Sequence, residues 1–411
     1  MLYLLLIIMI SSCFLSITIL YKKHDFTSPL FITNSIWIGI AIVGIFVHHL
    51  FFEFSTKIFL IWLSWSLTLN ITLLLMSSKN RKQTNRVYTV TLPNYWPYLL
   101  ALSAYMLYEV IKLGLNGPHP FLLNIRLANI MGYPSPIFSI FSRMYPLFFT
   151  LFLFEITLNN NKKNRYSTYL YMMIFVLYSA GKMAILTPII CYVAIRARRG
   201  EINFIKLIPL FFIILIAMLI LHYLRKSHGD ITPLLQTLAT YTYSPIIALG
   251  EVEPSSSLHW GENTFRLLYA LSYAFGISDI EPINLILNYS HIPTPTNVYT
   301  AIYIFYKDFG QLGVIWGAFI YGIIYSILYN SFIKQKTISS IIYLSALTPI
   351  TLSFFSETLI SLLSTYIQIL FYTFLIGLLY ERRKNRYSTR LLQWRKLHSQ
   401  SNIISTTANS Y

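Results

Sequence analysis

Charged residues are scarce in this sequence, and that scarcity is the first constraint on the kind of protein it encodes. Only 11% of its 411 residues are charged, whereas 55% are apolar. A soluble domain carries about a quarter charged residues. Apolar runs of about 20 residues recur along the chain, and each matches the ~30 Å hydrocarbon core of a bilayer. The composition excludes an ordinary soluble domain and predicts an all-α polytopic membrane protein.

Cysteine and acidic residues are also few. Cys13 and Cys191 both fall in apolar segments, so the sequence offers neither a disulfide framework nor a zinc-ligand spacing. The 14 acidic residues are outnumbered by 31 Lys and Arg, and the net charge is +17. These cations are concentrated in short connections on one side and in the C-terminal tail, which is the positive-inside pattern. We therefore expect no nucleic acid as a partner.

The apolar segments predict about eleven spans, each of a length suited to a bilayer. They lie near residues 2–21, 29–50, 57–76, 93–114, 137–157, 166–180, 182–196, 205–222, 311–332, 338–356 and 359–380. Basic stretches fall on every second connection, so we expect an outside N-terminus, with an uncleaved first span, and a cytoplasmic C-terminus. The short pair 166–180 and 182–196 requires a tight turn at "SAGK" (179–182).

This topology divides the chain into four parts. Residues 1–222 hold the N-terminal spans and a smaller outside loop at 116–136, residues 223–310 form a large outside loop, 311–380 hold the last spans, and 381–411 form a basic cytoplasmic tail. In the large loop, "TPLLQTLATY" (232–241) and "TFRLLYALSYAF" (264–275) have apolar residues at helical spacing and predict short helices. Half of the 14 acidic residues lie in this loop. Chemistry, if the protein performs any, is expected there.

Cations inside or beside the spans are the first candidates for a site, because a charge at the centre of a span costs a few kcal/mol unless it finds a partner or water. Arg143 lies about two turns into the predicted span 137–157. We interpret it as lining a binding site. The alternative is a buried ion pair with Glu109 or Glu155.

Four further cations stand near the predicted outer face: Lys182 at a span end, Arg126 in the smaller loop, and Arg225 and Arg266 in the large one. Arg126 and Arg266 lie among apolar residues, where the alternative to a functional role is snorkelling towards lipid headgroups. Arg225 follows a span directly, which is also typical of a plain boundary charge.

Acids and histidines of the large loop are candidates for proton transfer. The pairs in "GEVE" (250–253) and "SDIE" (278–281) resemble metal-holding acids of some glycosyltransferases, although such spacings are more typical of turns. His228, His259 and His291 could each act as a base because the histidine pKa lies near neutrality. For each of them alone, a structural role is the more typical one.

The stretch "NVYTAIYIFYKDFGQLGVIWGAFIYG" (297–322) interrupts an apolar run with Lys307 and Asp308. Residues 297–306 are too short to cross a bilayer, so they predict an interfacial or re-entrant half-helix. A break at 307–313 would then lie outside or in a cavity, where non-helical backbone is permitted. The glycines at 310, 313, 317 and 322 allow another backbone to approach closely. This pattern favours the edge of a site, with Asn297, Tyr299 and Asp308 as candidates, over an ordinary surface turn.

Two motifs carry a resemblance to a known family. "TNVYTAIYIFYKDFGQLGVIWGAFIYG" (296–322) and "YSAGKMAILTPII" (178–190) resemble the oligosaccharide repeat-unit polymerases, the O-antigen polymerases called Wzy. The layout of spans with one large loop in the second half is similar as well. Some members carry arginines followed by a glycine eleven residues later. Here Arg126 has no such glycine, and Arg266 reaches Gly276 after a shorter interval.

The resemblance implies a GT-C-like helical bundle in the bacterial inner membrane, with its active site facing the periplasm. It implies a glycosyltransferase that moves a growing glycan from undecaprenyl diphosphate onto the next lipid-linked repeat unit, without metal or cofactor. A chain-length regulator and a flippase are the implied protein partners, besides the lipid of the inner membrane.

Chemistry of this kind suits the candidate residues. Arginine can hold a departing diphosphate through two parallel hydrogen bonds, so Arg126 and Arg266 are predicted as catalytic cations. Asp308 and His228 are the candidates for activating the acceptor hydroxyl. Arg143, Lys182, Arg225, Asn297 and Tyr299 are predicted to bind substrate. An O-antigen ligase, or a flippase or transporter of the lipid-linked unit, remains the alternative.

Overall fold

The protein is mainly helical in the part of the chain described by the computed structural model. That part comprises residues 1–22, 25–77, 92–131, 136–158, 161–179, 181–202, 216, 220, 234–254, 259–293, 295–334 and 336–384. The N-terminal half contains α1 (Leu2–Lys22), α2 (Pro29–Val47), the 3-10 helix η1 (His48–Leu50), α3 (Thr56–Met76), α4 (Trp96–Leu115), α5 (Phe121–Met131), α6 (Pro136–Arg143), α7 (Tyr145–Leu158), α8 (Lys162–Ser179) and α9 (Lys182–Arg198). The remainder contains α11 (Leu234–Thr242), α12 (Ser244–Gly250), α13 (Arg266–Ala274), strands β1 (Ser290–His291) and β2 (Pro295–Thr296), α14 (Tyr303–Ile333), α15 (Thr337–Thr351) and a C-terminal helix, Leu363–Lys384.

Six of the described helices are long and apolar enough to cross a membrane: α1, α2, α3, α4, α14 and the C-terminal helix. The bent pair α6 and α7 makes a seventh if it is one span, and α15 is a shorter apolar helix. An all-α membrane protein is therefore the architecture. Helices α8 and α9 coincide with the predicted pair 166–180 and 182–196, and the chain leaves the helix between them, as "SAGK" predicted. The predicted span 205–222 lies almost wholly outside the described residues.

The structure differs from the predictions in three places. The span 137–157 is not one straight helix, because α6 and α7 meet at a 43° bend beside Met144. Helix α15 ends at Thr351 instead of residue 356, so a turn-rich connection of residues 352–362 precedes the C-terminal helix. The smaller loop 116–136 holds a helix, α5, which the sequence analysis did not predict. Both helices predicted in the large loop are confirmed, as α11 and α13, and α12 is an addition.

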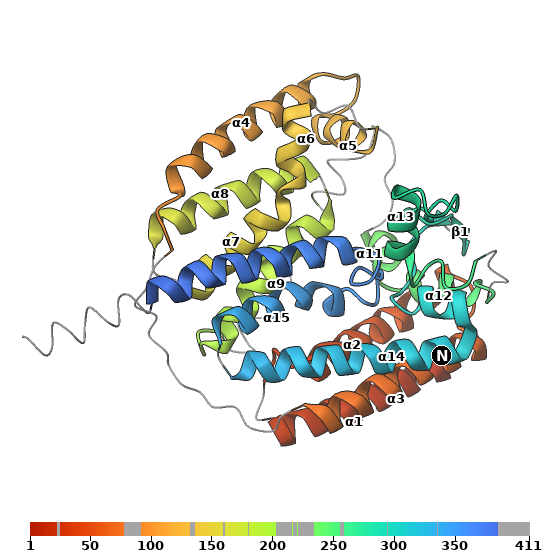
Figure 1. Cartoon of the computed structure of the whole chain (residues 1–411). Coiled ribbons are helices and arrows are strands. Elements are labelled where there is room, and N and C mark those ends of the chain that lie inside the picture. Colours follow the sequence, from red (N-terminus) through yellow and green to blue (C-terminus); the bar gives the residue numbers. More distant parts are fainter. Residues whose placement is uncertain are drawn as a thin grey trace, which may run out of the picture.

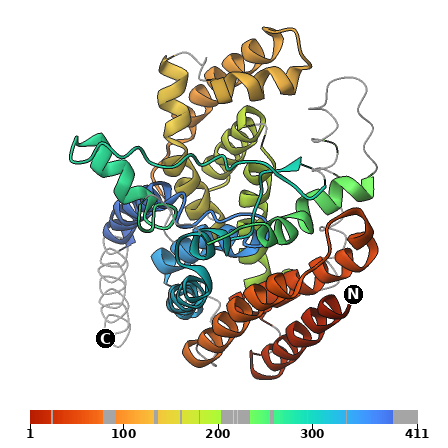
Figure 2. The same cartoon turned by 90° about the vertical axis from the view of Figure 1, so that its right-hand side faces the viewer.

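The short elements of the large loop gather at one end of the long helices (Figure 1). Strand β1 pairs with β2 there, and the amide of Phe52, in the α2–α3 connection, donates to the Ile292 carbonyl at 3.3 Å. We call this the loop end. Figure 2, which views the protein from this side, shows α11, α12 and α13 spread across the ends of the long helices.

The opposite end of the bundle, which we call the basic end, joins the connections that carry the positive charge. Buried Asp25, between α1 and α2, accepts hydrogen bonds from the hydroxyls of Thr27 (2.6 Å) and Tyr329 (2.7 Å). Arg198, at the end of α9, donates to the carbonyl of Ile333 at the end of α14. The chain near residues 25, 198 and 333 therefore meets at one end, as predicted for these basic connections, whereas the basic stretch 79–86 lies outside the described residues.

Helices α3 and α14 pack side by side and run in the same direction, as the predicted topology requires for the third and ninth spans. The Gln311 amide reaches the Ser64 hydroxyl near their starts, and the Asn330 amide donates to the Met76 carbonyl near their ends. Between these points, a Cβ at Gly322 would lie 2.6 Å from Thr72, so the absence of a side chain permits this close approach.

Helices α2 and α3 are joined by a reciprocal amide pair. Asn34 donates to the Asn70 side-chain oxygen at 2.9 Å, and Asn70 donates back at 3.2 Å. Both side chains are buried in the spanning region, where a polar group without a partner is unfavourable. The pair therefore sets the register of the two helices as well as joining them.

Candidate functional site

The first part of α14 folds back on the rest of that helix at Gly310. This glycine has φ 59° and ψ −146°, inside what is otherwise continuous helix. Such a backbone conformation is almost restricted to glycine. A Cβ on Gly313 would lie 2.2 Å from the Phe305 carbonyl oxygen, and a Cβ on Gly317 would lie 2.5 Å from the Phe305 ring. Residues 303–309 therefore form a short helix against the start of the long one, and the break predicted near residues 307–313 is confirmed.

This folded-back segment carries Asp308, whose carboxylate holds the chain just before α13. One oxygen accepts from the side-chain nitrogen of Asn263 at 2.6 Å, and the other accepts from the backbone N–H of Thr264 at 2.7 Å. Helix α13 begins two residues later at Arg266. Asp308 does not line the cavity described next. Its contacts make it a positioning residue for the start of α13.

A cavity of about 160 Å³ lies where α13, the start of α14 and the connection 352–362 meet. Its wall is formed by Asn263, Arg266, Ile283, Asn284, Leu285, Leu287, Tyr299, Thr300, Tyr303, Ile304, Ser356, Glu357, Thr358, Ser361 and Leu362. Pockets for drug-sized ligands usually measure ~300–1,000 Å³. The cavity is therefore suited to one phosphate group or part of one sugar, and a larger ligand would extend beyond it.

Arg266 supplies the positive charge of this cavity. Its side chain is half-buried, and its Nε donates to the Ile283 carbonyl at 2.8 Å. That bond orients the guanidinium but uses only one of its five N–H donors. Among the described residues, neither terminal nitrogen has a hydrogen-bond or ion-pair partner. An oriented cation with free donors suits an anionic ligand that presents two oxygens.

Glu357 supplies the negative charge, and its carboxylate is fully engaged. It accepts hydrogen bonds from the Tyr321 hydroxyl, from the backbone N–H groups of Leu359, Ile360 and Ser361 at 2.7–2.8 Å, and from the Ser361 hydroxyl at 2.7 Å. These bonds hold the turn that leads into the C-terminal helix. Arg266 and Glu357 line the same cavity without forming an ion pair with each other.

The remaining wall combines aromatic rings with a hydroxyl that has no partner. The rings of Tyr299 and Tyr303 pack at a centroid distance of 4.7 Å, and the Tyr299 hydroxyl donates to the Asn288 carbonyl at 3.1 Å. Burial raises the pKa of the Tyr299 phenol, so the hydroxyl stays protonated at neutral pH. Thr358 contributes a buried Oγ1 without a hydrogen-bond partner in the structure. This hydroxyl is therefore available to a ligand in the cavity.

The other predicted cations do not join this cavity. Arg126, on α5, donates to the Ser179 carbonyl at the end of α8. Arg143 is exposed at the bend between α6 and α7. Glu155, its proposed partner, instead accepts hydrogen bonds from Tyr95 and Asn164. Neither ion pair considered for Arg143 is formed in the described part of the chain.

The remaining candidates are spread over three places. Lys182 is the first residue of α9. Asn297 is half-buried in the segment between β2 and α14, two residues before Tyr299, but it is not part of the cavity wall. Arg225 and His228 lie outside the described residues.

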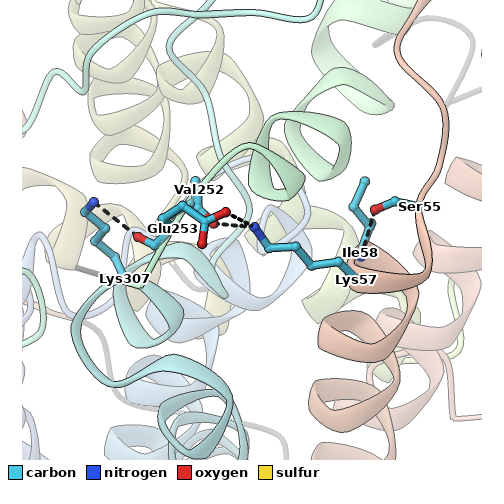
Figure 3. Close-up of polar contacts among 6 residues, drawn as sticks. All are labelled: Ser55, Lys57, Ile58, Val252, Glu253 and Lys307. Atoms are coloured by element: carbon cyan, nitrogen blue, oxygen red, sulfur yellow. Dashed lines mark hydrogen bonds and ion pairs between the residues drawn. The ribbon is translucent and has the colours of Figure 1, made fainter. Parts of the chain in front are cut away.

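One acid of each pair in the large loop has a side-chain partner. Glu253 forms an ion pair with Lys57 at the start of α3 (2.7 Å), and its backbone carbonyl accepts from Lys307 at 3.3 Å. Figure 3 shows how these residues link α3, the segment after α12 and the folded-back part of α14. Glu281 accepts from the Tyr273 hydroxyl at 3.2 Å. No group of three metal-ligating side chains occurs within the described ranges.

Several cavity residues were missed by the sequence analysis, namely Asn263, Tyr303, Glu357, Thr358 and Ser361. One signal for them was present. The segment "SFFSETLISLL" (353–363) places one acid in an apolar stretch between two predicted spans. An ionisable residue in that setting is a candidate for function by itself. Because a span was predicted up to residue 356, Glu357 was not considered as a candidate.

The fold and this cavity define a helical membrane protein with a cation-lined cavity at its loop end. Comparison with protein-family models, with curated proteins and with solved structures finds no match to the chain. The motifs at 178–190 and 296–322 and the cavity itself are the features that bear on function.

Proposed function

We propose that the protein is a glycosyltransferase that polymerises undecaprenyl-diphosphate-linked oligosaccharide units into O-antigen or a similar surface polysaccharide. In this proposal it lies in the bacterial inner membrane and works at the periplasmic face. It transfers the growing glycan from its lipid diphosphate carrier to the next lipid-linked unit.

The main support for the proposal is the Arg266 guanidinium in the cavity wall. The guanidinium is oriented by one hydrogen bond, and its terminal nitrogens are without a partner among the described residues. A diphosphate leaving the anomeric carbon develops negative charge on its oxygens. A fixed cation placed there stabilises the transition state without having to reorganise. Diphosphate is a good leaving group, so this step needs no proton donor.

Other parts of the wall suit the sugar. The faces of Tyr299 and Tyr303 supply flat apolar surface, and the Thr358 hydroxyl can bond a sugar hydroxyl or a phosphate oxygen. Glu357 has its oxygens engaged by five donors, so it cannot take a proton from the acceptor without losing one of those bonds. We assign Glu357 to holding this wall in place.

The test is a lipopolysaccharide gel from the encoding bacterium after deletion of this gene, in a strain without a second polymerase gene. The strain is complemented with wild type, Arg266→Ala, Arg266→Lys or the control Arg382→Ala. Arg382 is an exposed cation of the C-terminal helix, far along the sequence from the cavity. An epitope tag measures the membrane level of each variant.

We expect the deletion strain to show lipid A core with one repeat unit and no ladder. Wild type and Arg382→Ala should restore the ladder, Arg266→Ala should not, and Arg266→Lys should restore it partly because lysine lacks the bidentate fork. An unchanged ladder after deletion would overturn the proposal. Loss of all O-antigen, the single unit included, would assign the protein to the ligase or flippase alternative.

A further inference from the structure

A second cavity, at the side of the bundle, differs from the first in almost every respect. It measures about 450 Å³ and lies between α4 and the bent pair α6–α7. Its wall consists of Tyr95, Tyr98, Leu99, Leu102, Tyr105, Phe141, Phe148 and Leu151. All of these side chains are aromatic or leucine. We call it the lateral cleft. It shares no residue with the Arg266 cavity.

The lateral cleft runs along one face of α4. Its residues on α4 and at the N-cap of that helix, from Tyr95 to Tyr105, cover a rise of ~15 Å at about 1.5 Å per residue. This is half of the ~30 Å hydrocarbon core of a bilayer. Tyr98 stands at the rim with 80% of its surface exposed, whereas Leu99 below it is 3% exposed. The cleft therefore reaches from one membrane boundary to about the midplane, the depth that one phospholipid acyl chain occupies.

The boundary end of the cleft is positively charged. Helix α8 begins there with Lys162 and Lys163, both exposed. Asn164 fixes this start to the base of α4, because its side-chain oxygen accepts from the backbone N–H groups of Tyr95 and Trp96, at 3.3 Å each. Lys163 Nζ lies 5.2 Å from the centre of the Trp96 ring. Lys163 is thus held beside the start of α4, and Lys162 precedes it at the start of α8.

The wall at this end is held in place without a ligand. The Tyr95 hydroxyl donates to Glu155 of α7 at 2.9 Å, and the Asn161 amide donates to the Asn94 side-chain oxygen at 3.0 Å. These bonds fix the ends of α4, α7 and α8 relative to one another. A preformed apolar cleft with a polar, charged mouth loses little freedom when a lipid binds.

We propose that the lateral cleft is a binding site for an anionic phospholipid, with one acyl chain between α4 and α6–α7 and the phosphate against Lys162 and Lys163. The length of the cleft favours an acyl chain over a much longer polyprenyl chain. The two lysines favour an anionic headgroup over a zwitterionic one, because each lysine near such a surface contributes roughly fivefold in affinity.

The experiment titrates the purified, delipidated full-length protein with phosphatidylglycerol, with phosphatidylcholine of identical acyl chains, and with undecaprenyl phosphate, and native mass spectrometry measures the Kd of each. Two variants probe the two parts of the site: Lys162→Gln with Lys163→Gln for the mouth, and Leu102→Trp for the cleft. The matched controls are Lys334→Gln with Lys336→Gln, an exposed pair after α14, and Leu107→Trp, on the same helix outside the cleft. Size-exclusion chromatography shows that each variant is folded.

Wild type should prefer phosphatidylglycerol. The mouth variant should lose about 25-fold in affinity for phosphatidylglycerol and leave phosphatidylcholine unchanged, whereas folded Leu102→Trp should weaken both lipids. The control variants should match wild type. Equal binding of both lipids to wild type, an equal loss in the Lys334 and Lys336 control, or a folded Leu102→Trp with unchanged affinity would each overturn the proposal. Preference for undecaprenyl phosphate over phosphatidylglycerol at this cleft would overturn it as well.

Discussion

The two ends of the bundle use the same residue types for different purposes. At the basic end, Arg199 donates at 2.8 Å to the last carbonyls of α7, at Ile156 and Thr157, which otherwise lack helical partners. At the loop end, Arg266 lines a cavity and makes one backbone contact, and its terminal nitrogens have no partner among the described residues. One arginine completes a helix end, and the other has donors left for a ligand.

The buried carboxylates show a related difference. Asp25, at the basic end, receives the hydroxyls of Thr27 and Tyr329 and the Thr27 amide, and so joins α14 to the α1–α2 connection. Glu357, at the loop end, receives five donors and shapes a turn that forms part of the cavity wall. A buried carboxylate that accepts several hydrogen bonds therefore joins helices at the basic end. At the loop end, such a carboxylate shapes the wall of a cavity.

The largest expected effect is on stability, from Glu357→Ala. The change leaves buried donors, including the Tyr321 hydroxyl, without their acceptor, and should destabilise the fold by about 3–5 kcal/mol. Asp25→Ala, with fewer donors involved, should destabilise it by roughly half as much. The measurement is the temperature at which half of a detergent-solubilised fluorescent fusion still elutes as a single peak. A smaller loss of stability in Glu357→Ala than in Asp25→Ala would contradict the difference expected between the two carboxylates.

The next effect separates the two arginines. Arg266→Ala should reduce polymer formation by about 100-fold, as expected for removal of a group that stabilises transition-state charge, and should leave thermal stability nearly unchanged. Arg199→Ala should behave in the opposite way, with activity close to wild type and a stability loss of about 1 kcal/mol from uncapped carbonyls. Both variants are assayed for ladder formation and for melting temperature. If Arg266→Ala lowered both ladder formation and melting temperature, Arg266 would have a structural role, as Arg199 does.

The folded-back start of α14 provides a third test at the loop end. Gly313→Ala introduces a Cβ at 2.2 Å from a backbone oxygen, so the short helix must shift, at a cost of about 1–3 kcal/mol. Gly39→Ala in α2 is the matched control because nothing lies within 4 Å of its Cβ, and it should be neutral or stabilising by up to about 1 kcal/mol. Melting temperatures compare the two. A neutral Gly313→Ala would contradict the close packing at this corner.

The smallest expected effect concerns the amide pair between α2 and α3. Asn34→Leu removes the donor to the Asn70 side-chain oxygen, while the Asn70 nitrogen keeps Ser66 as a partner, and should cost about 1 kcal/mol. The double variant Asn34→Leu with Asn70→Leu should recover most of that loss, because it leaves no unsatisfied amide between the helices. A double-mutant cycle on melting temperatures measures the coupling. Additive losses would show that the two amides act independently.

Much of the helical framework could be predicted from the sequence. Apolar runs of bilayer length determined most of the long helices, and the break near Gly310 followed from glycines placed beside Lys307 and Asp308. The turn before Lys182 also followed from a local pattern. These features depend on composition and backbone preference within one segment, so a single stretch of sequence contains the necessary information.

The site could be predicted only in part. Arg266 and Tyr299 were recognised as candidates and do line one cavity, but Asp308 acts from outside its wall, and Arg126 and Arg143 lie elsewhere. Glu357 lies far from Arg266 in sequence and was not recognised at all. Local patterns indicate which side chains are chemically suitable, and they carry no information about which distant segments share a cavity.

By itself, the sequence determined a helical membrane protein with one basic end and one loop end, because hydrophobic length and charge distribution act on each helix separately. Only the tertiary structure decided that the start of α13, the folded-back start of α14 and the turn at Glu357 meet around one cavity. The same is true of the lateral cleft, whose walls come from α4, α6 and α7. The physical reason is that cavities arise from the packing of segments distant in sequence, and the bend beside Met144 and the fold-back at Gly310 direct that packing.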